Sequence, residues 1–78
     1  MSNENSMIGN KISKKIKLER NKRNLSQQDL ANLADIDKNT VWKIETGQVS
    51  PTISTLEKIA KAFGMDFNSF MDLSKVDL

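Results

Sequence analysis

The segment QQDLANLADIDKNTVWKIET, at residues 27–46, constrains the fold of this chain more than any other part of it. Leu30, Ala31 and Ala34 are three and four positions apart, which is the spacing of side chains on one face of a helix. Ala31 is small enough to let another helix cross this face closely and at a steep angle. The segment therefore predicts a short helix with a second helix packed tightly against it.

A turn and that second helix follow directly. Asp35 and Ile36 form the turn, and Asp37 stands at the N-cap, where its carboxylate can accept hydrogen bonds from the free amides of the next helix. Val41 and Ile44 are three apart and are expected to point inward. Two helices joined in this way form a helix-turn-helix motif.

The outward side of this second helix carries residue types that suit an acidic, hydrogen-bonding groove, such as the major groove of DNA. Lys38 can donate to guanine O6 and N7, and Asn39 can pair in a bidentate way with adenine. Lys43, about one and a half turns later, reaches a base or the flanking backbone. The hydroxyl of Thr40 either contacts DNA as well or donates a hydrogen bond to a carbonyl of its own helix.

Trp42, the only Trp of the chain, lies off the stripe of Val41 and Ile44. We expect it on the outward side, over Lys38 or against a thymine methyl or deoxyribose. The alternative is that it packs inward beside the first helix.

Composition excludes several kinds of chemistry. The chain has no Cys and no His, so it lacks disulfides, thiolate metal sites and the usual general base. We therefore expect no enzyme activity, no metal, no cofactor and no small-molecule ligand. No apolar run approaches the roughly 18 residues that span a bilayer, and the polar start MSNENS does not resemble a signal peptide. The sequence predicts a cytoplasmic protein with no membrane partner.

Charge is distributed unevenly along the chain. Residues 1–43 carry nine Lys or Arg and five acidic residues, whereas residues 44–78 carry three and five, so the two parts have net charges of +4 and −2. Such asymmetry is expected when one face meets a polyanion. The lysines of the first predicted helix are interpreted mainly as a solvated face, with one or two close enough to DNA to matter: Lys11, Lys14, Lys15 and Lys17.

Three more helices are predicted around the motif, which makes the fold all-α. Isoleucines four apart indicate a first helix at residues 8–23, and Asn24 ends it in the left-handed conformation. Ser26 caps the second helix, with Asp29 completing a capping box. The third helix ends near Gly47; a fourth begins at Thr52 and ends at Gly64; a short fifth follows Asp66.

The expected domain organisation is a disordered segment at residues 1–7, a DNA-binding domain at 8–72 and a tail at 73–78. Apolar residues near the C-terminus exceed what so short a monomer is expected to bury, which indicates a two-fold dimer interface. The residues predicted to form it are Phe70, Met71 and Leu73. The alternative is a frayed tail from Leu73 onward.

From about Gly9 to Phe70 the chain resembles the Xre family of helix-turn-helix domains, which includes the phage lambda and Cro-type repressors. The resemblance rests on Leu25-Ser26-Gln27, Leu30-Ala31, the pattern Val41, Ile44, Glu45, Gly47, Pro51, and the run Leu56, Ile59, Ala60, Ala62, Phe63, Gly64. It implies a compact five-helix, lambda-repressor-like fold whose second and third helices form the motif.

The chain departs from this family at three positions. Asp35 and Asn24 stand where Gly is common, and both residue types tolerate left-handed backbone. Trp42 stands where a small polar residue such as Ser is usual, which should alter DNA contact rather than fold.

The resemblance also implies roles for particular residues. Gln27 would bind a phosphate through its amide at the start of the second helix, the alternative being an ordinary polar residue. Thr46 and Gln48 would offer main-chain amides and short polar groups to the DNA backbone. Arg20 and Glu45 would form a structural ion pair between the first helix and the end of the third. The predicted DNA-contacting residues are Gln27, Asp37, Lys38, Asn39, Thr40, Trp42, Lys43, Thr46 and Gln48.

The sequence thus predicts a transcription regulator that binds double-stranded DNA at a palindromic operator as a homodimer. The alternative is an antitoxin, which represses its own operon and also binds a toxin protein; it would need an exposed apolar surface or a flexible extension, in the first seven residues or the tail. A further class is a protein-binding adaptor. Salt distinguishes the adaptor from a DNA-binding protein, because counterion release makes DNA affinity fall steeply with ionic strength, whereas an apolar protein contact hardly responds.

Overall fold

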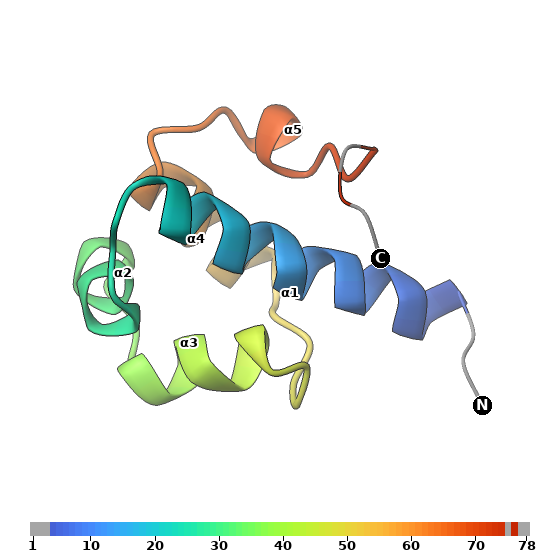
Figure 1. Cartoon of the computed structure of the whole chain (residues 1–78), viewed down its shortest axis with the longest axis horizontal. Helices are drawn as coiled ribbons and strands as arrows, with labels where there is room; N and C mark the ends of the chain where they lie inside the picture. Colours follow the sequence, from blue (N-terminus) through green and yellow to red (C-terminus); the bar gives the residue numbers. More distant parts are fainter. Residues whose placement is uncertain (1–3, 75, 77–78) are drawn as a thin grey trace.

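The structure, a computed structural model, describes residues 4–74 and 76, with side chains from residue 9 onward. This part of the chain contains five helices and no strand. The longest helix, α1, runs across the molecule, with α3 on one side of it and α5 on the opposite side (Figure 1). The helices are α1 (Glu4–Lys22), α2 (Gln27–Ala34), α3 (Lys38–Glu45), α4 (Ile53–Ala62) and α5 (Phe67–Phe70).

The first helix is longer than the isoleucine spacing predicts, because it begins at Glu4 rather than at residue 8. Residues 4–7 contain no Gly or Pro to interrupt a helix, so it extends beyond the apolar stripe. The predicted disorder of residues 1–7 is therefore wrong for residues 4–7, and residues 1–3 lie outside the described residues. At its other end, Asn24 has φ 56° and closes the helix as predicted.

The structure confirms the predicted ends of α2. The amide of Asp29 donates to Ser26 Oγ at 3.0 Å, and the amide of Ser26 donates to Asp29 Oδ2 at 2.9 Å, which confirms the capping box. The hydrogen bond from the Ser26 backbone amide lowers the pKa of the Asp29 carboxyl, and the Ser26 hydroxyl lowers it further. Asp35 has φ 55° and ends α2 in the left-handed conformation, as predicted.

One predicted cap is wrong. Asp37 occupies the N-cap position of α3, but its side chain makes no capping hydrogen bond. The carboxylate is exposed, so water can satisfy it without the helix amides. The backbone carbonyl of Asp37 still accepts from the amides of Thr40 at 3.0 Å and Val41 at 3.2 Å, which starts the helix.

The core lies where α1, α2, α3 and α4 meet, and α5 closes it. It contains the five motif residues that the sequence pattern predicts to point inward, each no more than 3% exposed. Burying a Val, Leu, Ile or Phe side chain stabilises the folded state by roughly 1.5 to 3 kcal/mol. The buried cluster is Ile16, Leu30, Ala31, Ala34, Val41, Ile44, Leu56, Ile59, Ala60, Phe63 and Phe70.

The C-terminal apolar residues are largely buried within one chain. Phe70 is 1% exposed, and its ring lies 6.0 Å from that of Phe63 at a tilt of 52°. Val76 is also buried, and Met71 and Leu73 are half-buried. Phe70 is therefore wrong as a dimer-forming residue, because α5 folds back over α4 and places its ring in the core. Residues 75, 77 and 78 of the predicted tail lie outside the described residues.

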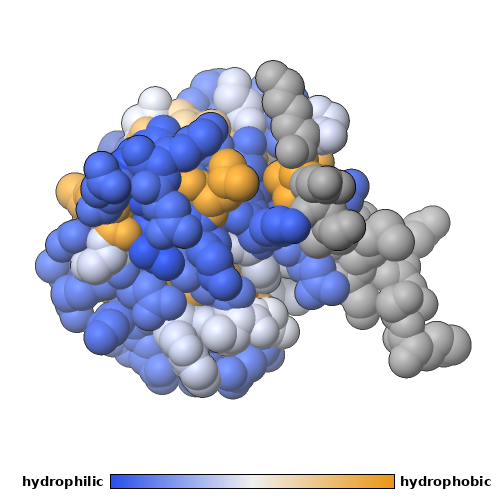
Figure 2. Space-filling view, in the orientation of Figure 1, coloured by the Kyte–Doolittle hydropathy of each residue, from blue (hydrophilic) through white to orange (hydrophobic). Residues whose placement is uncertain are grey.

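The surface on the side of the molecule shown in Figure 2 is mostly hydrophilic, with a few small apolar patches. No helix in the described part of the chain combines the length and the apolarity that crossing a membrane requires.

Candidate nucleic-acid interface

Helix α3 presents a polar face to solvent. Lys38, Asn39 and Lys43 are exposed and Thr40 is half-buried, while Val41 and Ile44 on the other side are buried. The inward and outward sides predicted for this helix are thus confirmed, and the two outward residues of its first turn are accessible to a ligand. Their contacts with DNA bases remain predictions.

Trp42 lies on the same outward face and is 43% exposed. It lines a shallow hollow of about 460 Å³ together with Gln27, Lys38 and Asn39. The alternative of an inward Trp42 is therefore wrong. The indole supplies an apolar wall beside the two side chains best suited to read bases, in a position where it can meet a thymine methyl group.

Gln27, at the start of α2, is held by a residue from the end of α3. Its amide Nε2 donates to Glu45 Oε1 at 3.2 Å, and the side chain is half-buried. An amide nitrogen carries two protons, so the second one can still reach a phosphate. The hydrogen bond orients this amide next to the hollow that Trp42 lines.

The predicted ion pair between Arg20 and Glu45 is confirmed. Arg20 donates from Nε to Glu45 Oε2 at 2.7 Å and from Nη2 to Glu45 Oε1 at 2.9 Å, while Nη1 donates to the carbonyl of Leu25 at 2.7 Å. The two side chains are 13% and 1% exposed. The hydrogen bonds to Glu45 raise the pKa of Arg20 despite its partial burial. The pair joins α1, the start of α2 and the end of α3.

The main-chain amides after α3 are not available to a phosphate, which corrects one prediction. Those of Thr46, Gly47 and Gln48 donate to the carbonyls of Trp42, Ile44 and Lys43 at 3.0, 3.1 and 2.8 Å. The Thr46 hydroxyl also donates back to the Trp42 carbonyl, at 2.8 Å. The last carbonyls of a helix lack partners within it, and these donors satisfy them. Of these groups, only the exposed side chain of Gln48 remains a predicted contact with the DNA backbone.

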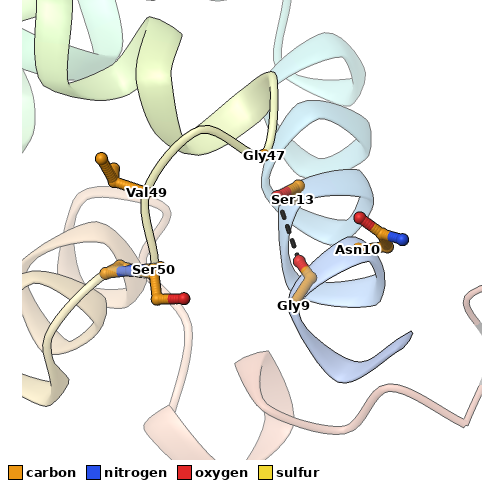
Figure 3. A pocket seen from close by; sticks show the side chains of 7 residues that line it. Gly9, Asn10, Ser13, Gly47, Val49 and Ser50 are labelled. Atoms are coloured by element: carbon orange, nitrogen blue, oxygen red, sulfur yellow. Dashed lines mark hydrogen bonds between the residues drawn. The ribbon is translucent and has the colours of Figure 1, made fainter. Parts of the chain in front are cut away.

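Sequence reasoning missed Ser13, which fixes α1 against the end of α3. This residue is buried, and its Oγ lies 2.6 Å from the carbonyl oxygen of Ile44 and 3.0 Å from that of Gly9. The signal available was its position three residues before Ile16, on the same helix face. Ser13 also lines a groove of about 250 Å³ between α1 and the α3–α4 loop (Figure 3), with Gly9, Asn10, Gly47, Val49, Ser50 and Pro51.

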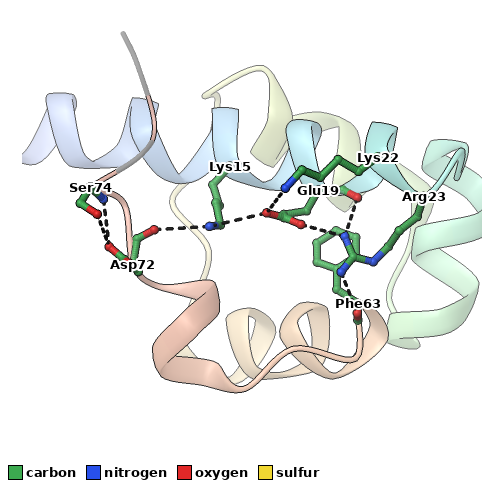
Figure 4. A network of polar contacts seen from close by, with 7 residues as sticks. All are labelled: Lys15, Glu19, Lys22, Arg23, Phe63, Asp72 and Ser74. Carbon is green, nitrogen blue, oxygen red and sulfur yellow. Dashed lines mark hydrogen bonds and ion pairs between the residues drawn. The ribbon is translucent and has the colours of Figure 1, made fainter.

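A second buried acid, on α1, organises the side of the molecule away from α3. Glu19, 5% exposed, lies 2.8 Å from Arg23 Nη1 and also pairs with Lys15 and Lys22 (Figure 4). Burial opposes ionisation of Glu19, but the Arg23 hydrogen bond and the nearby lysine charges outweigh it, so its pKa is lowered. Arg23 continues to the carbonyl of Phe63 at 3.0 Å and so ties α1 to the end of α4.

Two short helices joined through left-handed Asp35, the second with a polar outward face, define a helix-turn-helix domain. Residues 16–70 match the HTH_3 family model, described as Helix-turn-helix, and the chain belongs to this family.

Its relatives include regulators from several organisms. The chain is 35% identical over 67 residues to the cryptic phage CTXphi transcriptional repressor RstR of Vibrio cholerae, covering 86% of this chain and 60% of RstR. It is 34% identical over 70 residues to the HTH-type transcriptional regulator PuuR of Escherichia coli, covering 90% of this chain and 36% of PuuR. An uncharacterized HTH-type transcriptional regulator of Methanocaldococcus jannaschii is 37% identical over 54 residues, covering 69% of this chain and 82% of the relative.

The fold also matches a solved structure. The crystal structure of an HTH_3 family transcriptional regulator from Vibrio cholerae superposes with a TM-score of 0.81 at 35% identity, covering 88% of this chain and 40% of that one. The chain thus spans less than two thirds of the length of RstR, PuuR and this solved regulator.

Proposed function

We propose that this chain binds double-stranded DNA through α3 and regulates transcription, and that it acts by binding rather than catalysis. The observation that carries the proposal is the exposed face of α3, where Lys38, Asn39 and Trp42 surround one hollow. The names of RstR and PuuR as transcriptional regulators support it.

The dimensions of α3 suit the major groove. An α-helix with its side chains is about 10 to 12 Å in diameter, and the major groove of B-DNA, about 12 Å wide, admits it. With the helix in the groove, Lys38 and Asn39 at its start reach base edges, while Gln27 and the start of α2 meet a phosphate.

We propose further that two copies bind a palindromic operator, with half-sites about 34 Å apart. Phe70 is buried in the core and Met71 and Leu73 are half-buried, so we place the contact between copies on a surface with more exposed apolar residues. Val49, in the loop after α3, is 43% exposed, and Ile53, the first residue of α4, is 64% exposed. A two-fold contact there would place the two recognition helices side by side on one face of the duplex.

The antitoxin alternative has less support. It needs a flexible extension or a free apolar surface for the toxin, and the candidates were the first seven residues and the tail. Residues 4–7 have the helical backbone of α1, and Val76 of the tail is buried.

Selection of bound duplexes from a random pool tests the proposal. We expect an enriched palindrome whose half-sites are centred about one helical turn apart. Enrichment of a single unrepeated site would refute the dimer, and no enrichment at all would refute sequence-specific binding. Val49→Lys and Ile53→Lys should lower both the sedimenting mass and the operator affinity. Unchanged sedimentation of a dimeric protein in both variants would exclude this surface.

A further inference from the structure

The indole of Trp42 has no partner in the part of the chain that the structure describes. Among these residues, its Nε1 donates no hydrogen bond, and its ring takes no part in the aromatic and cation–π contacts, which join Phe63 to Phe70 and Arg23 to Phe63. The side chain is 43% exposed on the outward face of α3. An aromatic ring buries a large apolar area when a ligand covers it. The fold therefore leaves this ring available as a binding surface.

The other side chains that line the hollow beside this ring are polar. Lys38 and Asn39, about one turn earlier on α3, are exposed, and their side chains form no hydrogen bond or ion pair with another described residue. Gln27 contributes from α2, where its hydrogen bond to Glu45 fixes the amide. The hollow thus combines one apolar ring with three groups that can bond to the polar edge of a base.

The major-groove edge of a pyrimidine carries an apolar group only when the ring is methylated. Thymine presents a methyl group and the O4 acceptor, whereas cytosine presents an amino donor and no methyl group. Lys38 and Asn39 suit guanine and adenine, so their contacts leave the indole without a role. Because Trp42 shares a hollow with these two side chains, a duplex that they read brings its base edges, rather than its deoxyriboses, to the indole.

We propose that the hollow at Trp42 binds the methyl group of a pyrimidine, so that methylation of cytosine at this position of the operator half-site strengthens binding. Methylation at ring position 5 gives cytosine the same methyl group in the same place as thymine, and an apolar contact depends on that group rather than on the base that carries it. The inference rests on the proposed DNA binding and deepens it, since it names the group that is read and makes binding responsive to DNA methylation.

The experiment uses the duplex recovered from the random pool. Each thymine is replaced in turn by uracil, which lacks only the methyl group. At the position where uracil weakens binding most, a cytosine–guanine pair is then introduced, with and without the methyl group on cytosine. Affinities are measured for the unmodified protein, Trp42→Ser and Leu33→Ser, and circular dichroism checks that each is folded. Leu33 is the matched control, because it is 58% exposed on α2 and lines a different hollow.

Uracil at the contacted position should weaken binding by the unmodified protein about fourfold, which corresponds to about 0.8 kcal/mol for one buried carbon group. Methylation of the cytosine should strengthen binding by about the same factor. Leu33→Ser should keep both ratios. Trp42→Ser should bring both ratios close to one, since it removes the surface that the methyl group covers.

Fluorescence gives a second measurement that needs no substitution, because Trp42 is the only Trp of the chain. Acrylamide should quench the complex with the uracil duplex more strongly than the complex with the thymine duplex. Uracil tolerated at every position, as a deoxyribose contact would give, or a uracil effect that persists in Trp42→Ser, would overturn the methyl contact and leave DNA binding by α3 intact. If the unmodified protein bound no duplex, both proposals would fail.

Discussion

Replacing Glu45 with Ala should destabilise the fold more than any other change of a polar residue of α3. Glu45 is 1% exposed at its side chain and accepts two hydrogen bonds from Arg20 and one from Gln27. Removing it leaves the Arg20 guanidinium, which is only 13% exposed, without its carboxylate. Loss of one partner of a buried pair typically costs about 3 to 5 kcal/mol.

The lower end of that range is the better estimate here, because Arg20 keeps some exposure and its hydrogen bond to the Leu25 carbonyl. A chain of this length has a total free energy of unfolding of about 4 to 12 kcal/mol, at roughly 0.05 to 0.15 kcal/mol per residue. A loss of about 3 kcal/mol is therefore a quarter or more of the stability.

Urea unfolding followed by far-ultraviolet circular dichroism measures this loss. Glu57→Ala is the matched control, since Glu57 is exposed on α4 and its removal should stay within about 0.5 kcal/mol. The double variant Arg20→Met/Glu45→Leu should recover most of the loss, because apolar residues can replace a buried pair at little cost. If Glu45→Ala were no more destabilising than Glu57→Ala, the view that this pair joins three helices would be wrong.

Three other predictions follow from the site and from the buried acid of α1. Lys38→Ala and Asn39→Ala should each weaken binding to the selected operator by about 1 to 3 kcal/mol and relax preference at one base position, without loss of stability; unaltered base preferences in repeated selections would contradict the role of α3. Trp42, 43% exposed, should fluoresce at the long wavelengths of a hydrated indole, be quenched by acrylamide, and lose that quenching on operator binding; emission that operator leaves unchanged would place the indole outside the interface. Glu19 has a lowered pKa, so its contribution to stability should be complete above the ordinary Glu pKa of about 4.3 and lost as pH falls through the lower folded value. Acid unfolding of Glu19→Gln should therefore depend less on pH between these values, and an identical pH profile would refute it.

Local features were predictable because they depend on residues within about four positions of one another. The Ser26–Asp29 capping box needs only a hydroxyl and a carboxylate three residues apart, and Asn24 and Asp35 tolerate left-handed backbone through their own short side chains. The same short range explains why the inward side of α3 could be identified from Val41 and Ile44.

Part of the candidate site was predictable for the same reason, together with the family resemblance. The outward position of Trp42 follows from helical spacing, and the ion pair of Arg20 with Glu45 follows from the resemblance to the Xre family. The link from Gln27 to Glu45 could not be predicted from spacing, because eighteen positions separate the two residues and only the crossing of α2 and α3 brings them together.

Tertiary structure decided which groups remain free to act. An apolar residue such as Phe70 has the same sequence signature in a core and in a dimer interface, and only the return of α5 over α4 placed it in the core. The main-chain amides of residues 46–48 were available in principle, but they donate to the last carbonyls of α3. The sequence by itself determined most helix ends, though not the start of α1 at Glu4, since capping and turn interactions are local. The packing of distant helices determined which side chains and amides are left for a partner.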